Sequence, residues 1–163
     1  MPAGPALIVV GWREWIAFPE LGLPAVRAKV DTGAATSAIH AHAVERFERG
    51  GAPYARFDVH PFFRLTRRVT VACEAPVVGR RRVTSSSGHT DSRLVVGVTL
   101  RLGVRADAPE WPVELTLADR RAMRFPMLLG REAMAGRVAV DPGASFRLGD
   151  LDRVADLYDN GNP

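Results

Sequence analysis

The sequence predicts a mainly β fold: a closed or partly closed β-barrel with one or two short helices. Apolar residues alternate in short runs, which is the period expected of half-buried strands. Glycine and proline, at 15 and 12 of the 163 residues, separate these runs. Strands that are short and evenly spaced avoid bare sheet edges most simply by closing into a barrel.

Seven segments show the alternation expected of strands. We expect prolines such as Pro76 and Pro112 to end strands, because proline cannot donate a hydrogen bond to a sheet. The predicted strands are residues 6–11, 25–30, 54–59, 69–73, 82–85, 93–102 and 113–117.

Two stretches are predicted as helices, residues 42–49 and residues 131–135 after Gly130. The tail spaces Leu151, Val154 and Leu157 at three-residue intervals, which favours a further short amphipathic helix. The chain length suits one domain, so we expect a single domain over residues 1–149 and a tail over residues 150–163.

Cysteine content and hydropathy exclude several classes of protein. Cys73 is the single cysteine, so no intrachain disulfide can form, and we expect it to fill apolar space in a strand. The apolar run at residues 7–10 is short and no basic segment precedes it, so we expect a cytoplasmic protein without a membrane partner. No phosphate-binding GxxxxGK[ST] loop occurs, and we expect no cofactor.

Arginine dominates the basic residues, because Lys29 is the only lysine among 22 lysines and arginines. Arginines cluster at residues 67–68, 80–82 and 120–121, and the net charge of +4 favours anionic partners. No aromatic interleaving or RNA-binding signature accompanies them, so we interpret these clusters as solvated surface and do not expect nucleic-acid binding.

The segment VDTGAAT places Asp31 at the end of an apolar strand, directly before Thr32 and Gly33. A carboxylate there is costly unless it is hydrogen-bonded, and glycine allows backbone amides to approach it while the threonine hydroxyl adds a donor. Asp31, Thr32 and Gly33 are therefore candidate catalytic residues. Three residues alone are a weak motif, since Asp and Gly are also common in turns.

A second motif strengthens this interpretation. Residues 125–132, FPMLLGRE, form an apolar run that ends in Gly-Arg and opens a helix. Together the two motifs resemble the retropepsin-like aspartic proteases. The closest resemblance is to the bacterial RimB-like family, also labelled ATP-dependent zinc proteases and associated with ATP-grasp glutamate ligases. It rests on VDTGAATSAIHA (30–41), VTSSSGHTDSRLVV (83–96), LTLADR (115–120) and FPMLLGRE (125–132), and spans residues 9–148.

The resemblance implies a retropepsin-like barrel and an aspartic peptidase that works as a homodimer. Two carboxylates about 3 Å apart cannot both ionise, so Asp31 from each of two copies would share one proton and activate water. Peptide or protein substrates are implied, with glutamate-rich tails added by the ligase as one class. The resemblance also implies substrate contacts from Ala34, from Arg131 and from a flap that holds Ser86, Ser87, Gly88 and His89.

The flap interpretation has its own support in the sequence. Residues 83–96 read as two strands joined by the polar loop 85–92, and such a hairpin can close over a substrate. Arginines at 80–82 and Arg93 flank the loop and would suit an acidic peptide, because guanidinium groups bind carboxylates. A simple exposed hairpin remains the alternative.

Two positions depart from the pattern of related enzymes. Ala34 stands where pepsin-like enzymes place a hydroxyl residue, so the dyad has one donor fewer and we expect activity nearer neutral than acidic pH. Ala35 occupies the position of the aspartate that pairs with the Gly-Arg arginine in retroviral relatives. We therefore expect Arg131 to bond Asp119 or Glu132, or to bind substrate.

Three alternatives stay open from the residues. His40 and His42, with His60 and His89, could form a metal-dependent site, although no HExxH helix is present. The segment VDPGA at 140–144 echoes VDTGA, so Asp141 could complete a dyad within one chain, although Pro142 lacks an amide hydrogen. The chain could also be a peptide-binding module without catalysis.

Overall fold

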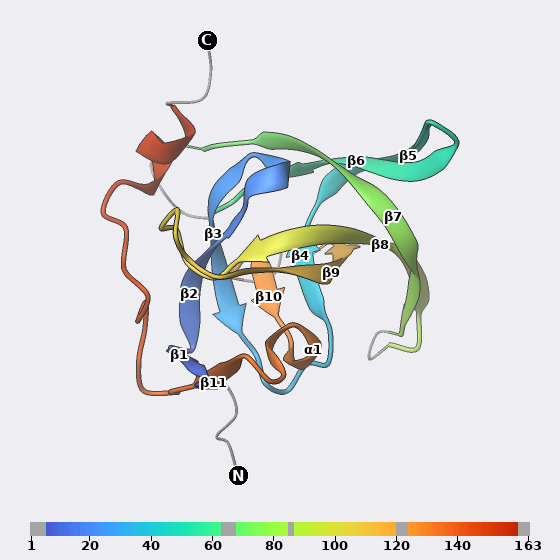
Figure 1. Cartoon of the computed structure of the whole chain (residues 1–163). Helices are drawn as coiled ribbons and strands as arrows, with labels where there is room; N and C mark the ends of the chain where they lie inside the picture. Colours follow the sequence, from blue (N-terminus) through green and yellow to red (C-terminus); the bar gives the residue numbers. More distant parts are fainter. Residues whose placement is uncertain (1–5, 63–67, 85–86, 120–123, 160–163) are drawn as a thin grey trace.

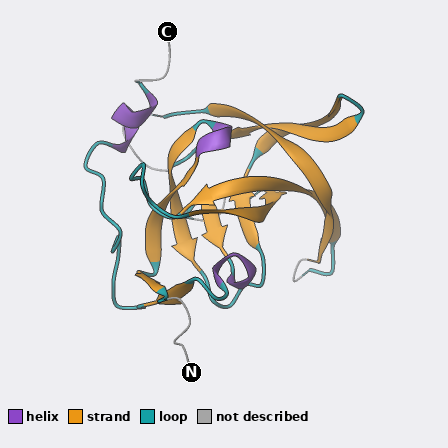
Figure 2. Ribbon diagram, viewed as in Figure 1, coloured by secondary structure: helices purple, strands orange, loops and turns teal. Residues whose placement is uncertain are grey.

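Strands dominate the computed structural model, which describes residues 6–62, 68–84, 87–119 and 124–159 (Figures 1 and 2). The predicted mainly β fold is confirmed. The elements are β1 (Ile8–Val10), β2 (Arg13–Phe18), the 3-10 helix η1 (Pro19–Leu21), β3 (Leu23–Val30), β4 (Ser37–His40), β5 (His42–Arg49), β6 (Ala52–Val59), β7 (Val71–Thr84), β8 (Thr90–Arg101), β9 (Glu110–Ala118), β10 (Met127–Leu129), α1 (Arg131–Met134), β11 (Val138–Val140) and the 3-10 helix η2 (Val154–Tyr158).

Nine of these strands form one sheet that curls into a partly closed ring. Its order is β2-β3-β10-β4-β9-β8-β7-β6-β5, and β2 also pairs with β8 where Ala17 faces Arg101. Large apolar side chains fill the interior, among them the fully buried Phe18, Leu100 and Phe57. Burying side chains of this size supplies most of the free energy that holds such a sheet closed.

The middle of the sheet brings the two sequence motifs together. β10 lies between β3, to which it runs parallel, and β4, to which it runs antiparallel. Leu129 is in register with Val30, so Asp31 and Gly130 follow their strands at the same end of the sheet. Figure 1 shows the ends of β3 and β10 beside α1 at the lower side of the molecule.

The helix predicted at residues 42–49 is wrong, because these residues form β5. Its partner β6 follows after Gly50 and Gly51, whose φ angles of 59° and 81° suit a two-residue hairpin turn. Prolines also do not end strands as expected. Pro76 lies inside β7, so the predicted strands 69–73 and 82–85 belong to one strand, and Pro112 lies inside β9.

The other predicted helices are present in shorter form. α1 covers Arg131–Met134, and the tail contains η2, whose Tyr158 hydroxyl bonds the backbone carbonyl of Ala25 in β3. Trp15 Nε1 donates to Asp150 Oδ1 (3.1 Å) and attaches the tail to β2. None of the helices in the described ranges has the length and apolar character needed to cross a membrane.

Candidate active site

The Asp31 turn is held by three hydrogen bonds that backbone amides donate, one of them to the carboxylate itself. The Asp31 amide donates to the Leu129 carbonyl (2.9 Å), so the turn starts as a continuation of the pairing between β3 and β10. The Gly33 amide donates to Oδ1 of Asp31 (2.8 Å), and the Ala34 amide donates to the Asp31 carbonyl (3.3 Å). The carboxylate is half-buried, and no ion pair involves it in the described part of the chain. Asp31 therefore has a fixed orientation and one oxygen open to a further partner.

The Gly-Arg motif forms hydrogen bonds to the residues that follow this turn. The Gly130 amide donates to the Ser37 hydroxyl (3.0 Å), and the amides of Arg131 and Glu132 donate to the carbonyls of Ala34 (2.8 Å) and Ala35 (2.9 Å). A Cβ atom at position 130 would lie 2.4 Å from the carbonyl oxygen of Thr36. Only glycine allows the two segments to approach this closely.

Arg131 extends the same support with its side chain. Its Nη1 donates to the carbonyl oxygen of Thr32 (2.9 Å), inside the turn itself. The expected pairing with Asp119 or Glu132 is wrong. Asp119 instead lies near His40, with 3.7 Å between its Oδ1 and Nδ1 of the imidazole.

The similar segments VDTGA and VDPGA also adopt similar structures. β1 and β11 pair in parallel with Val10 in register with Val140, as β10 and β3 do with Leu129 and Val30. The Asp141 amide donates to the Val10 carbonyl (2.8 Å), and the Gly143 amide donates to Oδ1 of Asp141 (3.0 Å). Each bond has its counterpart at Asp31.

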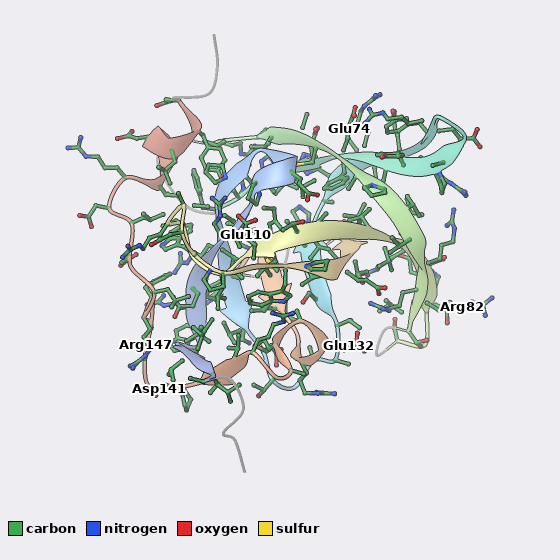
Figure 3. All side chains as sticks on the ribbon, viewed as in Figure 1. Glu74, Arg82, Glu110, Glu132, Asp141 and Arg147 are labelled. Atoms are coloured by element: carbon green, nitrogen blue, oxygen red, sulfur yellow. The ribbon has the colours of Figure 1, made fainter. Side chains whose placement is uncertain are left out.

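Trp12 links the two turns. Its amide donates to the Ala144 carbonyl (2.8 Å), and its own carbonyl accepts from the Val30 amide (2.8 Å). Gly11 mirrors Gly130, because a Cβ atom there would lie 2.3 Å from the Ala144 carbonyl oxygen. Asp141 lies at the lower edge of Figure 3. The chain thus contains two equivalent acidic turns, of which only the Asp31 turn carries a hydroxyl residue after the aspartate.

The predicted flap is the hairpin of β7 and β8. Thr84 faces Thr90 across its end, with their hydroxyl oxygens 3.3 Å apart. Ser87, Gly88 and His89 form an exposed tip, while Ser86 lies outside the described residues.

Arginines line the hairpin on both faces. Arg81 donates to the Thr116 hydroxyl (3.0 Å) and lies 3.8 Å from Glu114. Arg80 and Arg82 point to the other face, are exposed, and form no ion pair within the described ranges. Figure 3 shows Arg82 pointing outward beside the hairpin.

An open groove of about 690 Å³ lies over β8 and β9, where Thr99, Trp111 and Glu114 are among its lining residues, and Asp31 does not line it. Thr36 and Ser37 line it next to the turn, with Arg81 from β7 and Glu132 and Arg137 from α1 and the residues after it. Sequence reasoning missed this groove. The available signal was the position of Thr36 and Ser37 directly after VDTGAA.

Three of the four histidines, His40, His42 and His60, form a stack of rings. The His42 ring lies 5.8 Å from the His40 ring and 4.5 Å from the His60 ring, measured between centroids. His40 is 4% exposed, and burial lowers the pKa of its imidazole, an effect that Asp119 partly offsets. No group of three or more His, Cys, Asp or Glu side chains is arranged to hold a metal ion among the residues that the structure describes. The residues present do not fit a zinc centre.

Comparison with known proteins places these features in a family. A family model described as "Retropepsin-like aspartic endopeptidase RimB" matches residues 9–148. A crystal structure of a Legionella pneumophila protein of unknown function superimposes with a TM-score of 0.71 at 27% identity, over 87% of this chain and 98% of that one.

Curated relatives carry a different name. A protein of Desulfotalea psychrophila named probable alpha-L-glutamate ligase is 44% identical over 89% of this chain, and one of Parasynechococcus marenigrum with the same name is 48% identical over 93%. The chain spans only 30% and 32% of their lengths. The greater part of each relative therefore lies outside the match.

Proposed function

The chain belongs to the RimB-like family of retropepsin-like aspartic endopeptidases, and from that premise we propose that it hydrolyses peptide bonds with a pair of Asp31 carboxylates from two copies. The observation that carries the proposal is the Asp31 turn. One carboxylate oxygen accepts from the Gly33 amide at 2.8 Å, and the turn is fixed from behind by Gly130 and Arg131.

The chemistry requires a second carboxylate close to the first. When two such groups approach within about 3 Å they hold one proton between them, because two like charges at that distance repel strongly. The ionised carboxylate takes a proton from water, and the oxygen of that water attacks the peptide carbonyl carbon. The protonated carboxylate gives its proton to the carbonyl oxygen. Collapse of the tetrahedral intermediate then breaks the C–N bond, and the amine leaves with a proton from the dyad.

A homodimer supplies the second carboxylate in this proposal. The two Asp31 turns meet across a twofold axis, which makes the contact self-complementary. Asp141 lies in a turn of the same hydrogen-bond geometry, but its turn has Pro142 where the Asp31 turn has Thr32. The hydroxyl next to the carboxylate is missing there, so we assign catalysis to Asp31.

We further propose that the substrates are acidic peptides, with glutamate-rich tails as the first class to test. The named activity of the curated relatives is glutamate ligation, and each relative combines a segment similar to this chain with a longer remainder. That combination supports our proposal of a functional link between this chain and an ATP-grasp glutamate ligase. Arg80 and Arg82 are exposed and form no ion pair with the residues that the structure describes, which supports the choice of substrate, since guanidinium groups bind carboxylates well.

A pair of matched variants tests the catalytic proposal. Asp31→Asn and Asp141→Asn each keep an oxygen that can accept the glycine amide of its turn, so both should fold like the wild type. We expect Asp31→Asn to abolish cleavage of a glutamate-rich peptide and Asp141→Asn to leave it intact. If Asp141→Asn loses cleavage and Asp31→Asn does not, the catalytic aspartate would be Asp141 and not Asp31. A purified chain that binds such a peptide without cleaving it would support a non-catalytic binding module instead.

A further inference from the structure

We propose that the outer edge of β5 pairs with the same edge of a second copy of this chain, antiparallel and in the register that places Phe47 opposite its counterpart. β5 is the last strand of the nine-stranded sheet, so one of its edges has no partner among the strands that the structure describes. The hairpin of β5 and β6 projects from the upper right of Figure 1, and most of β5 is exposed. An exposed edge of this length is a template for another strand.

The turn of the hairpin determines which backbone groups face outward. Gly50 and Gly51 close a two-residue turn, so Arg49 and Ala52 form a hydrogen-bonded pair. The backbone amide and carbonyl of successive residues point to opposite edges of a strand, so those of Phe47, like those of Arg49, point toward β6. Arg46 and Glu48 therefore turn their amides and carbonyls toward the open edge.

Three symmetric antiparallel registers place Arg46 or Glu48 opposite Arg46 or Glu48 of the second copy. In the first Arg46 faces Arg46, and in the second Glu48 faces Glu48, so both place like charges opposite each other. In the third Arg46 faces Glu48, and the same register places Glu45 opposite Arg49. Only the third register pairs every facing charge with its opposite, and it puts Phe47 on the twofold axis.

Most side chains of this edge are available for the contact, while Arg49 also forms an ion pair with Glu74. Glu45, Arg46 and Glu48 form no ion pair within the described part of the chain. Phe47 is held by the guanidinium groups of Arg49 and Arg56, which lie 5.4 and 4.8 Å from its ring centre. Charges on an edge normally discourage pairing with other strands. Here the same charges select one partner, a second copy in one register.

The contact is separate from the proposed Asp31 pair. Figure 3 places Glu74, at the base of the hairpin, toward the opposite side of the molecule from Glu132 and Asp141. β6 pairs with the first half of β7, whose second half belongs to the β7–β8 hairpin. Pairing of two β5 edges would therefore join two such hairpins through one continuous sheet. A single strand pair buries little area, so we expect weak, concentration-dependent association.

Disulfide cross-linking tests the register. In Phe47→Cys the two introduced side chains would face each other with Cβ atoms about 5 Å apart, within reach of a disulfide. Val44 would face Gly50, so in the control Val44→Cys the two thiols would be about 20 Å apart. The native Cys73 adds no background, because it is buried and burial raises the pKa of its thiol to about 12. We expect mild oxidation to cross-link Phe47→Cys and not Val44→Cys; equal cross-linking of the two would overturn the proposal.

Charge exchange tests the same contact in solution. Arg46→Glu and Glu48→Arg each place like charges opposite each other, and we expect either change to weaken self-association in sedimentation runs about tenfold. The double variant Arg46→Glu/Glu48→Arg should restore it, while Arg153→Glu on the exposed tail serves as a control for net charge. The pairing would be contradicted if the single variants associated as strongly as the wild type. It would also be contradicted if the double variant associated as weakly as the single variants. Asp31 is untouched in all these variants, so peptide cleavage is scored separately.

Discussion

The guanidinium of Arg131 donates a hydrogen bond to the carbonyl oxygen of Thr32 at 2.9 Å, and so joins the start of α1 to the Asp31 turn across 99 positions of sequence. Retroviral relatives place an aspartate where this chain has Ala35, so the arginine here bonds backbone instead of a carboxylate. The side chain of Arg131 therefore supports the Asp31 turn through a main-chain carbonyl. That arrangement has direct consequences for activity.

Replacing Arg131 should reduce catalysis more than stability. Arg131→Ala removes the bond to Thr32 but leaves the amide bonds of the motif, and Arg131 is exposed. We expect kcat to fall on the order of tenfold, because small displacements of a catalytic group are costly. Steady-state kinetics together with a thermal melt measure this. A fall in melting temperature large enough to explain the lost activity would assign Arg131 a purely structural role.

Gly130→Ala should destabilise the fold by about 2–3 kcal/mol. The added Cβ would lie 2.4 Å from a backbone oxygen, so either strand must shift. Gly79→Ala is a matched control, since no atom lies within 4 Å of its Cβ position. Urea unfolding of both variants compares them, and equal stability of the two would show that the close approach at Gly130 is not needed.

Glu14 should be essential for attaching the residues that follow β11. Its carboxylate is fully buried and accepts from the amides of Gly11 (2.6 Å), Arg147 (2.9 Å) and Leu148 (3.1 Å). Glu14→Ala leaves one buried and two partly buried amides without this acceptor, and we expect a loss of about 3 kcal/mol in unfolding free energy. Glu14→Gln keeps an acceptor oxygen and should lose less. The reverse order in a denaturant titration would argue against this role.

The buried His40 should make stability depend on pH. Burial lowers its pKa in the folded state below the ordinary value of about 6.5, so the unfolded chain binds more protons as the pH falls through that value. Stability is therefore highest above about pH 6.5 and declines toward acid. Urea midpoints at pH 7.5 and 5.5 should differ more in wild type than in His40→Gln, and an equal difference in both would exclude His40 as the source.

Much of the fold was predictable because it depends on local alternation. All seven predicted strands overlap observed ones, and the Gly33 amide bonds the Asp31 carboxylate as the glycine suggested, whereas no described hydrogen bond joins the Thr32 hydroxyl to it. The helix predicted at residues 42–49 failed for a physical reason. Val44 and Phe47 lie three apart as in an amphipathic helix, but the Gly50-Gly51 turn and cross-strand contact of Phe47 with Tyr54 select a strand.

Other features depend on contacts between distant residues and were not predictable. β10 and β11 have three residues each, too few for a recognisable period, and only pairing with β3 and β1 makes them strands. The partner of Arg131 is a backbone carbonyl, and because every residue has one, the sequence does not indicate which carbonyl it is. The echo at Asp141 was visible in sequence, whereas its matching hydrogen bonds appear only when β1 is placed beside β11.

Subunit mixing tests the central claim most directly. Wild type and Asp31→Asn are unfolded together, refolded at equal amounts and assayed at constant total protein on a glutamate-rich peptide. If each active site takes one Asp31 from each of two copies, only dimers of two wild-type chains cleave, and the activity per total protein falls to about one quarter of the wild-type value. Activity that falls only to about one half would mean that each chain works alone, and would contradict the shared dyad.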